Sequence, residues 1–140
     1  MLYKNLASRS LTLSTNSFVE KLMDMNIGIV GGRDFKDYDL LKKTMDDYIV
    51  NKSFLTAIVS GGATGADTLA EQYAAEIDIE MIVYRPEREK YRRNAPLMRN
   101  TQIIEASDVV FAFWDGKSRG TLDSINKAKK FEKPLFIVNY

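Results

Sequence analysis

A glycine-rich segment at residues 60–67 has the composition of an anion-binding loop. Its sequence is SGGATGAD, between a predicted strand and a predicted helix. Glycines leave backbone N–H groups accessible, and with the positive end of the following helix dipole they can bind a phosphate without a basic side chain. No Gly-Lys-Ser or Gly-Lys-Thr follows, which excludes P-loop nucleotide hydrolysis. Alternatively, Thr64 and Asp67 form a capping box, although that leaves the glycines unexplained.

A second loop of this kind, GGRDF, occupies residues 31–35. Its two glycines permit a tight turn close to a ligand, and Arg33 offers a planar guanidinium for phosphate or carboxylate. The loop lacks the G-x-G-x-x-G spacing, and no acidic residue ends the second predicted strand, so an NAD-dependent dehydrogenase is not indicated. The alternative is a glycine turn in which Asp34 or Asp37 caps the following helix.

The segment WDGKSRGT, at residues 114–121, again combines glycines and hydroxyls with a helix start. Asp115 is placed to accept hydrogen bonds from ribose hydroxyls or to hold a water molecule, while Gly120 and Thr121 could hold a phosphate. Trp114 could stack on a base, and it could equally be a core residue.

Positive charge is concentrated in residues 85–99, RPEREKYRRNAPLMR, where six basic and two acidic residues give a net charge of +4. Arg85 directly follows the third predicted strand, on the predicted ligand edge. Arg99 lies in an apolar helical segment, where a cation needs a partner. The other four cations fit a solvated helix face: Arg88, Lys90, Arg92 and Arg93.

Short apolar runs alternate with helical patterns and must position these loops. The predicted strands are residues 27–30, 57–60, 81–84, 109–113 and 135–138. The predicted helices are residues 38–49, 66–74, 97–105 and 122–128. Continuously apolar strands are typical of a sheet covered on both faces, and right-handed crossovers place every strand-to-helix loop on one edge. We therefore predict an α/β fold, a Rossmann-like three-layer sandwich with a mostly parallel sheet of about five strands.

The amino-acid composition excludes several classes of catalytic mechanism. The 140-residue chain has the size of one domain and contains no cysteine and no histidine, which excludes disulfides, thiolate chemistry and histidine-based triads. We expect no metal and no cofactor. The net charge of +1 gives no reason to expect nonspecific binding to DNA or membranes.

Residues 1–24 differ from the rest of the chain, because residues 8–17, SRSLTLSTNS, are rich in serine and the first acidic residue is Glu20. We interpret them as an N-terminal extension before an internal start at Met23 or Met25, with a transit peptide as the alternative. Residues 25–140 form the predicted domain. No apolar run approaches the ~20 residues of a membrane-spanning helix, so we expect a soluble, cytoplasmic protein without a membrane partner.

Taken together and in this order, GGRDF, SGGATGAD, RPEREKYRRNAPLMRN and FWDGKSRGT resemble the SLOG superfamily, specifically its YspA or cpYpsA-related branch. The resemblance covers residues 26–140. It implies a pocket for a nucleotide-related ligand, since relatives include the lonely-guy phosphoribohydrolases and sensors of NAD-derived messengers. Another branch of the superfamily binds single-stranded DNA.

The resemblance also implies which residues would carry catalysis. In the phosphoribohydrolases a helical arginine, which Arg99 resembles, acts with a glutamate three residues after a Gly-Thr pair. Ser124 stands at that glutamate position, and a serine cannot stabilise an oxocarbenium-like state. Asp115 or the neighbouring Asp123 would have to supply the carboxylate, with Asp34 as a further candidate.

The sequence therefore predicts a sensor or binding module for a nucleotide-derived ligand. The alternatives are hydrolysis or transfer at an N-glycosidic bond, and binding of single-stranded DNA through residues 85–99. A homodimer is plausible. The predicted catalytic residues are Arg99, Asp115 and Asp123. The predicted ligand-binding residues are Gly31, Gly32, Arg33, Ser60, Gly61, Gly62, Thr64, Gly65, Asp67, Arg85, Arg99, Asn100, Trp114, Asp115, Gly116, Ser118, Gly120 and Thr121.

Overall fold

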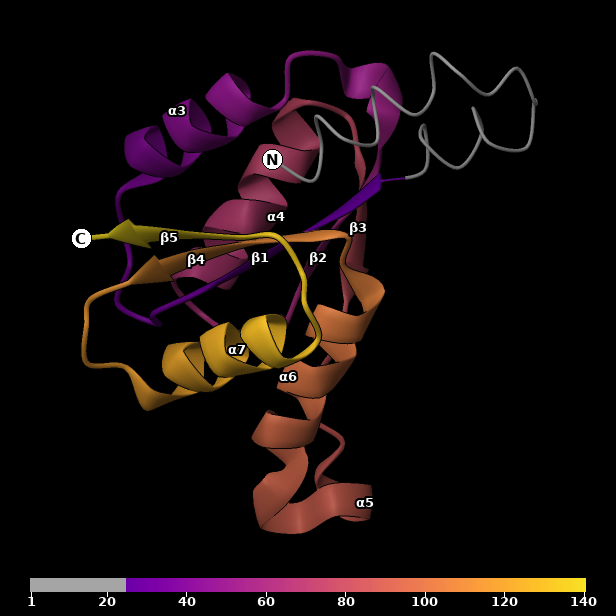
Figure 1. Ribbon diagram of the computed structural model, residues 1–140, viewed down its shortest axis with the longest axis vertical. Helices are drawn as coiled ribbons and strands as arrows, with labels where there is room; N and C mark the ends of the chain where they lie inside the picture. The colour runs from indigo at the N-terminus through magenta and orange to yellow at the C-terminus, as the bar shows by residue number, and fades with distance from the viewer. Residues whose placement is uncertain (1–24) are drawn as a thin grey trace.

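A five-stranded parallel sheet forms the centre of the molecule (Figure 1). The computed structural model describes residues 25–140, so the predicted extension at residues 1–24 lies outside the described part. The strand order is β3-β2-β1-β4-β5, and every neighbouring pair is parallel. The strands are Met25–Gly31 (β1), Leu55–Ser60 (β2), Glu80–Val83 (β3), Val109–Trp114 (β4) and Leu135–Asn139 (β5).

Helices cover both faces of this sheet, which confirms the predicted three-layer α/β fold (Figure 1). Helices α3 (Tyr38–Tyr48) and α4 (Ala66–Glu76) lie on one face, and α6 (Ala95–Ala106) and α7 (Arg119–Lys130) lie on the other. Each layer has its own apolar cluster, and burial on both sides explains why the central strands β1, β2 and β4 are continuously apolar. The edge strand β5 is less covered, because its Phe136 and Ile137 are exposed. The first cluster includes Ile27, Ile29, Leu41, Met45, Tyr73 and Phe111. The second includes Val30, Val59, Ile103, Val110, Ile125 and Ala128.

The order of the strands reverses beside β1, whose two neighbours are β2 and β4. The chain moves outward from β1 to β2 and β3 in one direction, and returns to β4 and β5 on the other side. In open α/β sheets the crevice beyond the carboxyl ends of the strands at such a point is the usual ligand site. The connections β1–α3, β2–α4 and β4–α7 all begin at this edge.

Between β3 and α6 the chain forms a projection that the sequence did not predict. It consists of the single-turn helix α5 (Arg88–Tyr91) and the 3-10 helix η2 (Arg92–Asn94), at the lower end of the molecule in Figure 1. The predicted helix at residues 97–105 corresponds to α6, which begins two residues earlier because Pro96 occupies its first turn. A further 3-10 helix, η1 (Lys52–Phe54), precedes β2.

Within residues 25–140 the structure contains no helix with both the length and the apolar character that a membrane crossing requires.

Candidate functional site

A pocket of about 400 Å³ opens at the carboxyl edge of the sheet, where the three loops meet helix α6. Nine of the predicted ligand-binding residues line it: Gly31, Arg33, Asp67, Arg99, Asn100, Asp115, Ser118, Gly120 and Thr121. The remaining predicted positions do not line it: Gly32, Ser60, Gly61, Gly62, Thr64, Gly65, Arg85, Trp114, Gly116 and the catalytic candidate Asp123. The sequence-distant loops are thus brought together, although part of the glycine-rich segment lies behind the pocket wall.

The β2–α4 loop binds an anion, but that anion is its own Asp67. This carboxylate is 8% exposed, and its Oδ2 accepts a hydrogen bond from the Ala63 N–H at 3.0 Å. The Gly61 N–H also donates to Asp67, and the Ala66 N–H donates to the Gly32 carbonyl at 3.1 Å. The predicted capping box is absent, because the N-cap position of α4 is taken by Gly65, and no side chain caps the helix there. Three backbone donors of this loop, the N–H groups of Gly61, Ala63 and Ala66, are therefore already used within the protein.

Arg99 is a buried cation with unused donors. It is 8% exposed; its Nη1 donates to the Gly61 carbonyl at 2.7 Å and its Nε donates to Asn100 Oδ1 at 3.1 Å. Within residues 25–140 no carboxylate forms an ion pair with it. Burial lowers the pKa of Arg99, the charge of Asp67 raises it, and the charge of Arg33 lowers it. The remaining N–H groups of the guanidinium have no partner among the described residues, so they can donate to an anion.

The β1–α3 loop presents Arg33 to solvent at the pocket. The alternative prediction, that an aspartate of this loop caps the following helix, holds for Asp37. Its side chain caps α3 by accepting a hydrogen bond from the Leu40 N–H at 3.0 Å. Asp34 instead accepts a hydrogen bond from the Tyr140 hydroxyl at 2.7 Å. Gly32 is required by close approach, because a Cβ there would lie 2.0 Å from that hydroxyl. The loop is thus fixed by Tyr140, which directly follows β5, while the Arg33 side chain stays unpaired among the described residues.

The β4–α7 loop also satisfies its own backbone. Asp115 Oδ1 accepts hydrogen bonds from the N–H groups of Lys117 and Ser118, both at 2.8 Å, and these bonds hold the pKa of Asp115 below its usual value. The Ser118 side chain caps α7 by accepting from the Thr121 N–H. Trp114 packs against the second apolar cluster and donates from Nε1 to the Ser118 carbonyl at 3.0 Å, which favours its core role.

The three predicted catalytic residues differ in position. Asp115 and Arg99 line the pocket, whereas Asp123 Oδ2 accepts from Asn100 Nδ2 at 3.1 Å and from Lys127 Nζ at 2.8 Å outside it. Ser124, at the position where related hydrolases have a glutamate, does line the pocket. Sequence reasoning missed five apolar wall residues, since nothing in their type distinguishes them from core: Val30, Ala63, Pro96, Leu97 and Ile103.

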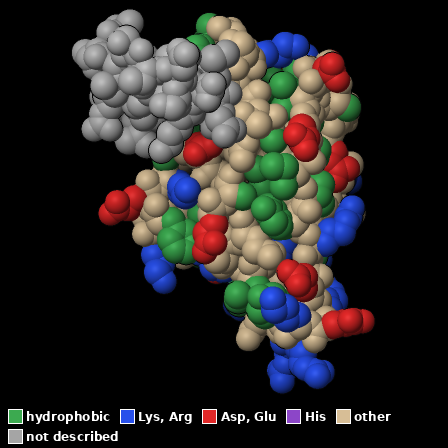
Figure 2. Space-filling view, turned by 90° about the vertical axis from the view of Figure 1, so that its right-hand side faces the viewer, with side chains coloured by type: hydrophobic (Ala, Val, Ile, Leu, Met, Phe, Trp, Pro, Cys, Tyr) green, Lys and Arg blue, Asp and Glu red, His purple; other side chains and the backbone are tan. Residues whose placement is uncertain are grey.

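Positive side chains gather on the projection beside this pocket. The side chains on α5 and η2 that carry this charge are all exposed, and Figure 2 shows Lys and Arg side chains at the lower end of the molecule. They are Arg88, Lys90, Arg92 and Arg93. Arg85, at the base of the projection, donates from Nη1 to the Gly62 carbonyl at 3.1 Å.

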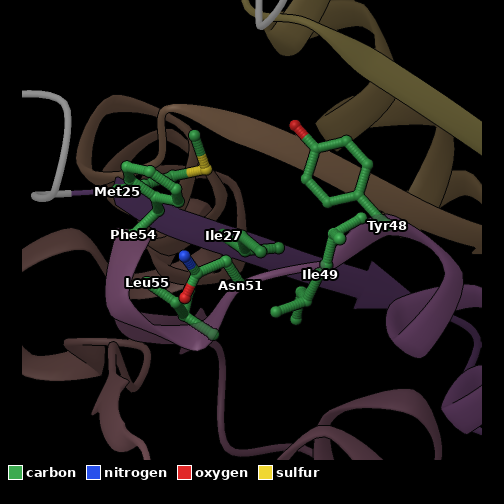
Figure 3. A pocket seen from close by; sticks show the side chains of 8 residues that line it. Met25, Ile27, Tyr48, Ile49, Asn51, Phe54 and Leu55 are labelled. Atoms are coloured by element: carbon green, nitrogen blue, oxygen red, sulfur yellow. The ribbon is translucent and has the colours of Figure 1, made fainter. Parts of the chain in front are cut away.

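A second, much smaller pocket lies at the opposite edge of the sheet, beside the start of β1 (Figure 3). Its volume is about 10 Å³, and its walls are mostly apolar side chains such as Met25, Tyr48 and Phe54. A cavity of that size holds about one water molecule, so it offers no room for a ligand.

The fold and the pocket define a Rossmann-like α/β protein with its candidate site at the carboxyl edge of a parallel sheet. The model of the YspA, cpYpsA-related SLOG family matches residues 25–91. The resemblance found in the sequence is therefore confirmed over these residues.

The chain is similar to a phage protein in sequence and to DNA processing proteins in structure. The Gene 61 protein of Mycobacterium phage D29 is 28% identical over 113 residues, which cover 76% of this chain and 90% of that protein. DNA processing protein A from Helicobacter pylori, whose structure was solved to explain its single-stranded DNA binding mode, is 25% identical with a TM-score of 0.64, covering 84% of this chain and 67% of that one. DNA processing protein A from Streptococcus pneumoniae is 20% identical with a TM-score of 0.67 over 85% of this chain, which spans about half of that protein (52%).

These comparisons contradict the predicted function as a sensor or binding module for a nucleotide-derived ligand. The similar structures are of DNA processing proteins, and the one from H. pylori binds single-stranded DNA. The site gives a physical reason for the error, because the Gly61 amide, which was assigned to a nucleotide phosphate, and the neighbouring Ala63 amide already bind Asp67. The weaker of the two alternatives, single-stranded DNA binding, is the better supported.

Proposed function

We propose that this chain binds single-stranded DNA across the mouth of the carboxyl-edge pocket and along the α5–η2 projection. One observation carries the proposal: exposed cations of the projection adjoin a pocket whose wall contains Arg33 and the buried Arg99. The similarity to H. pylori DNA processing protein A supports it independently.

Phosphate contacts supply most of the affinity of nonspecific DNA binding, and arginine suits them because its planar fork matches phosphate oxygens. The whole chain has a net charge of only +1, so attraction for DNA must come from a local cluster. The projection supplies such a cluster, and Arg92 and Arg93 make no hydrogen bond or ion pair to other described residues that would neutralise them.

Apolar side chains beside the cations favour a single strand over a duplex. Leu97 is 45% exposed and Met98 is 36% exposed in the first turn of α6, next to the projection, and the half-buried Tyr91 belongs to α5. Unpaired bases can pack against such surfaces, whereas the bases of a duplex are stacked on one another and unavailable.

The test compares two double variants with the same change in charge. Arg92→Ala with Arg93→Ala removes two projection cations. Lys129→Ala with Lys130→Ala removes two exposed cations at the far end of α7. Fluorescence anisotropy with a labelled oligothymidylate should show the first pair weakening binding about tenfold and reducing the slope of log affinity against log salt by about 0.7 per lost contact, while the lysine pair changes little. Equal losses in both pairs, or no binding by the natural chain at low salt, would contradict the proposal.

A further inference from the structure

Asp67 occupies the position that an anion would take in the β2–α4 loop. Its Oδ2 accepts from the Ala63 N–H at 3.0 Å, and the Gly61 N–H also donates to the carboxylate. A Cβ built on Gly61 would lie 3.0 Å from the same oxygen and 2.5 Å from Arg99 Nη1. The Asp67 carboxylate and the Arg99 guanidinium therefore both pack closely against Gly61, and a side chain at that position would displace both groups.

The pocket wall as a whole carries more negative than positive charge. Three carboxylates line it, those of Asp34, Asp67 and Asp115, against two guanidiniums, those of Arg33 and Arg99, which gives a formal charge of −1. A terminal phosphate carries about −1.5 to −2 charges at neutral pH, whereas an internal phosphodiester carries one. Repulsion by the buried Asp67 carboxylate therefore disfavours the entry of a terminal phosphate more strongly than the entry of an internal phosphodiester.

An internal phosphodiester needs no place in the loop. Arg33 is exposed at the mouth, and the cations of the projection lie outside the pocket wall, away from Asp67. A strand that crosses the mouth can bind these cations without displacing the carboxylate from its amide donors. The internal carboxylate therefore opposes a small phosphate monoester but not a polymer.

We infer that Asp67 is a specificity-determining residue, which keeps phosphate monoesters and other terminal phosphates out of the loop and restricts the site to the internal phosphodiesters of a polynucleotide. The inference rests on the proposed function, because it assigns the class of phosphate that the same site accepts.

The variant Asp67→Asn removes the charge and keeps the size and one acceptor oxygen. We expect the natural chain to bind a 5′-hydroxyl oligothymidylate and a 5′-phosphorylated one equally, with no thermal shift from thymidine monophosphate or inorganic phosphate. The variant should bind the 5′-phosphorylated strand at least about tenfold more tightly than the natural chain does, and should show a thermal shift with inorganic phosphate. Its affinity for the 5′-hydroxyl strand should stay within about threefold.

Asp39→Asn, which removes an exposed carboxylate on α3, controls for overall charge and should gain nothing. If Asp67→Asn does not fold, Asp67→Ser provides the same test with a smaller acceptor. The inference would be overturned if the natural chain bound thymidine monophosphate, or if neither Asp67 variant gained phosphate binding. In both cases the proposed function stays intact as long as the natural chain binds the 5′-hydroxyl strand. Failure of the natural chain to bind the 5′-hydroxyl strand overturns the proposed function itself.

Discussion

Asp67 links the chemistry of the site to the stability of the protein at the scale of a single residue. Burial raises its pKa more than the hydrogen bonds from Ala63 and Gly61 and the charge of Arg99 lower it. The folded protein thus binds a proton at Asp67 more tightly than the unfolded chain does. This contribution to stability is fully present below the ordinary aspartate pKa and is lost as pH rises through the raised value.

We therefore expect Asp67→Asn to be at least as stable as the natural chain at neutral pH, because the amide keeps an acceptor and carries no desolvated charge. The difference in free energy of unfolding should shrink as the pH falls below the ordinary aspartate pKa, where the protonated carboxyl resembles an amide. Urea denaturation of both proteins, from neutral pH to below the ordinary aspartate pKa, measures this difference in free energy of unfolding. A difference that grows on acidification would show that the ionised carboxylate, paired with Arg99, is the stabilising form.

At the scale of the element, Gly65 joins two loops of the site. It has a φ of +78°, and a Cβ there would lie 2.2 Å from the Gly32 carbonyl oxygen. The β1–α3 and β2–α4 loops can therefore touch only because this residue has no side chain. Gly120 differs, since it lies in the first turn of α7 and a Cβ built there meets nothing within 4 Å.

The two glycines should respond oppositely to alanine. Gly65→Ala should lower the free energy of unfolding by about 1–3 kcal/mol, because both its conformation and its space exclude a Cβ. Gly120→Ala should raise it by about 0.5–1 kcal/mol through helix propensity. Guanidinium denaturation monitored by circular dichroism gives both values. A neutral Gly65→Ala would mean that the two loops can separate without cost.

At the scale of the whole molecule, one sheet holds the two apolar layers together. Leu41 is fully buried in the first layer, and Trp114, the only tryptophan of the chain, packs against the second. Because the strands between them contribute side chains to both layers, the protein should unfold as a single cooperative unit.

Leu41→Ala tests this coupling, since deleting a buried leucine side chain costs about 2–5 kcal/mol. Tryptophan fluorescence, which reports on the far layer, should show the same loss of stability as far-ultraviolet circular dichroism. Val50→Ala, at a side chain that is 89% exposed, is the control and should leave both transitions unchanged. A fluorescence transition unaffected by Leu41→Ala would show that the layers unfold separately.

Much of this architecture was predictable because local patterns and chirality determine it. The apolar runs at residues 27–30 and 109–113 lie inside β1 and β4, and right-handed crossovers leave one edge for every strand-to-helix loop. The exposed cations of residues 85–93 were also evident as a cluster, although their use for DNA was ranked below nucleotide binding.

The errors came from contacts that sequence patterns do not specify. Asp67 was compatible both with a capping box and with a loop prepared for phosphate, and only the folded loop directs its carboxylate to the Gly61 and Ala63 amides. Asp34 meets Tyr140 although 106 residues separate them. Nothing local to either residue predicts that bond.

The sequence by itself therefore determined the layers, the parallel sheet and the edge at which the loops meet, because hydrophobic periodicity and backbone handedness act locally and repeat along the chain. Only the tertiary structure decided which charges at that edge are already paired. Pairing depends on the positions of a few side chains from distant segments, and a difference of a few ångströms separates a free amide from one that holds a carboxylate.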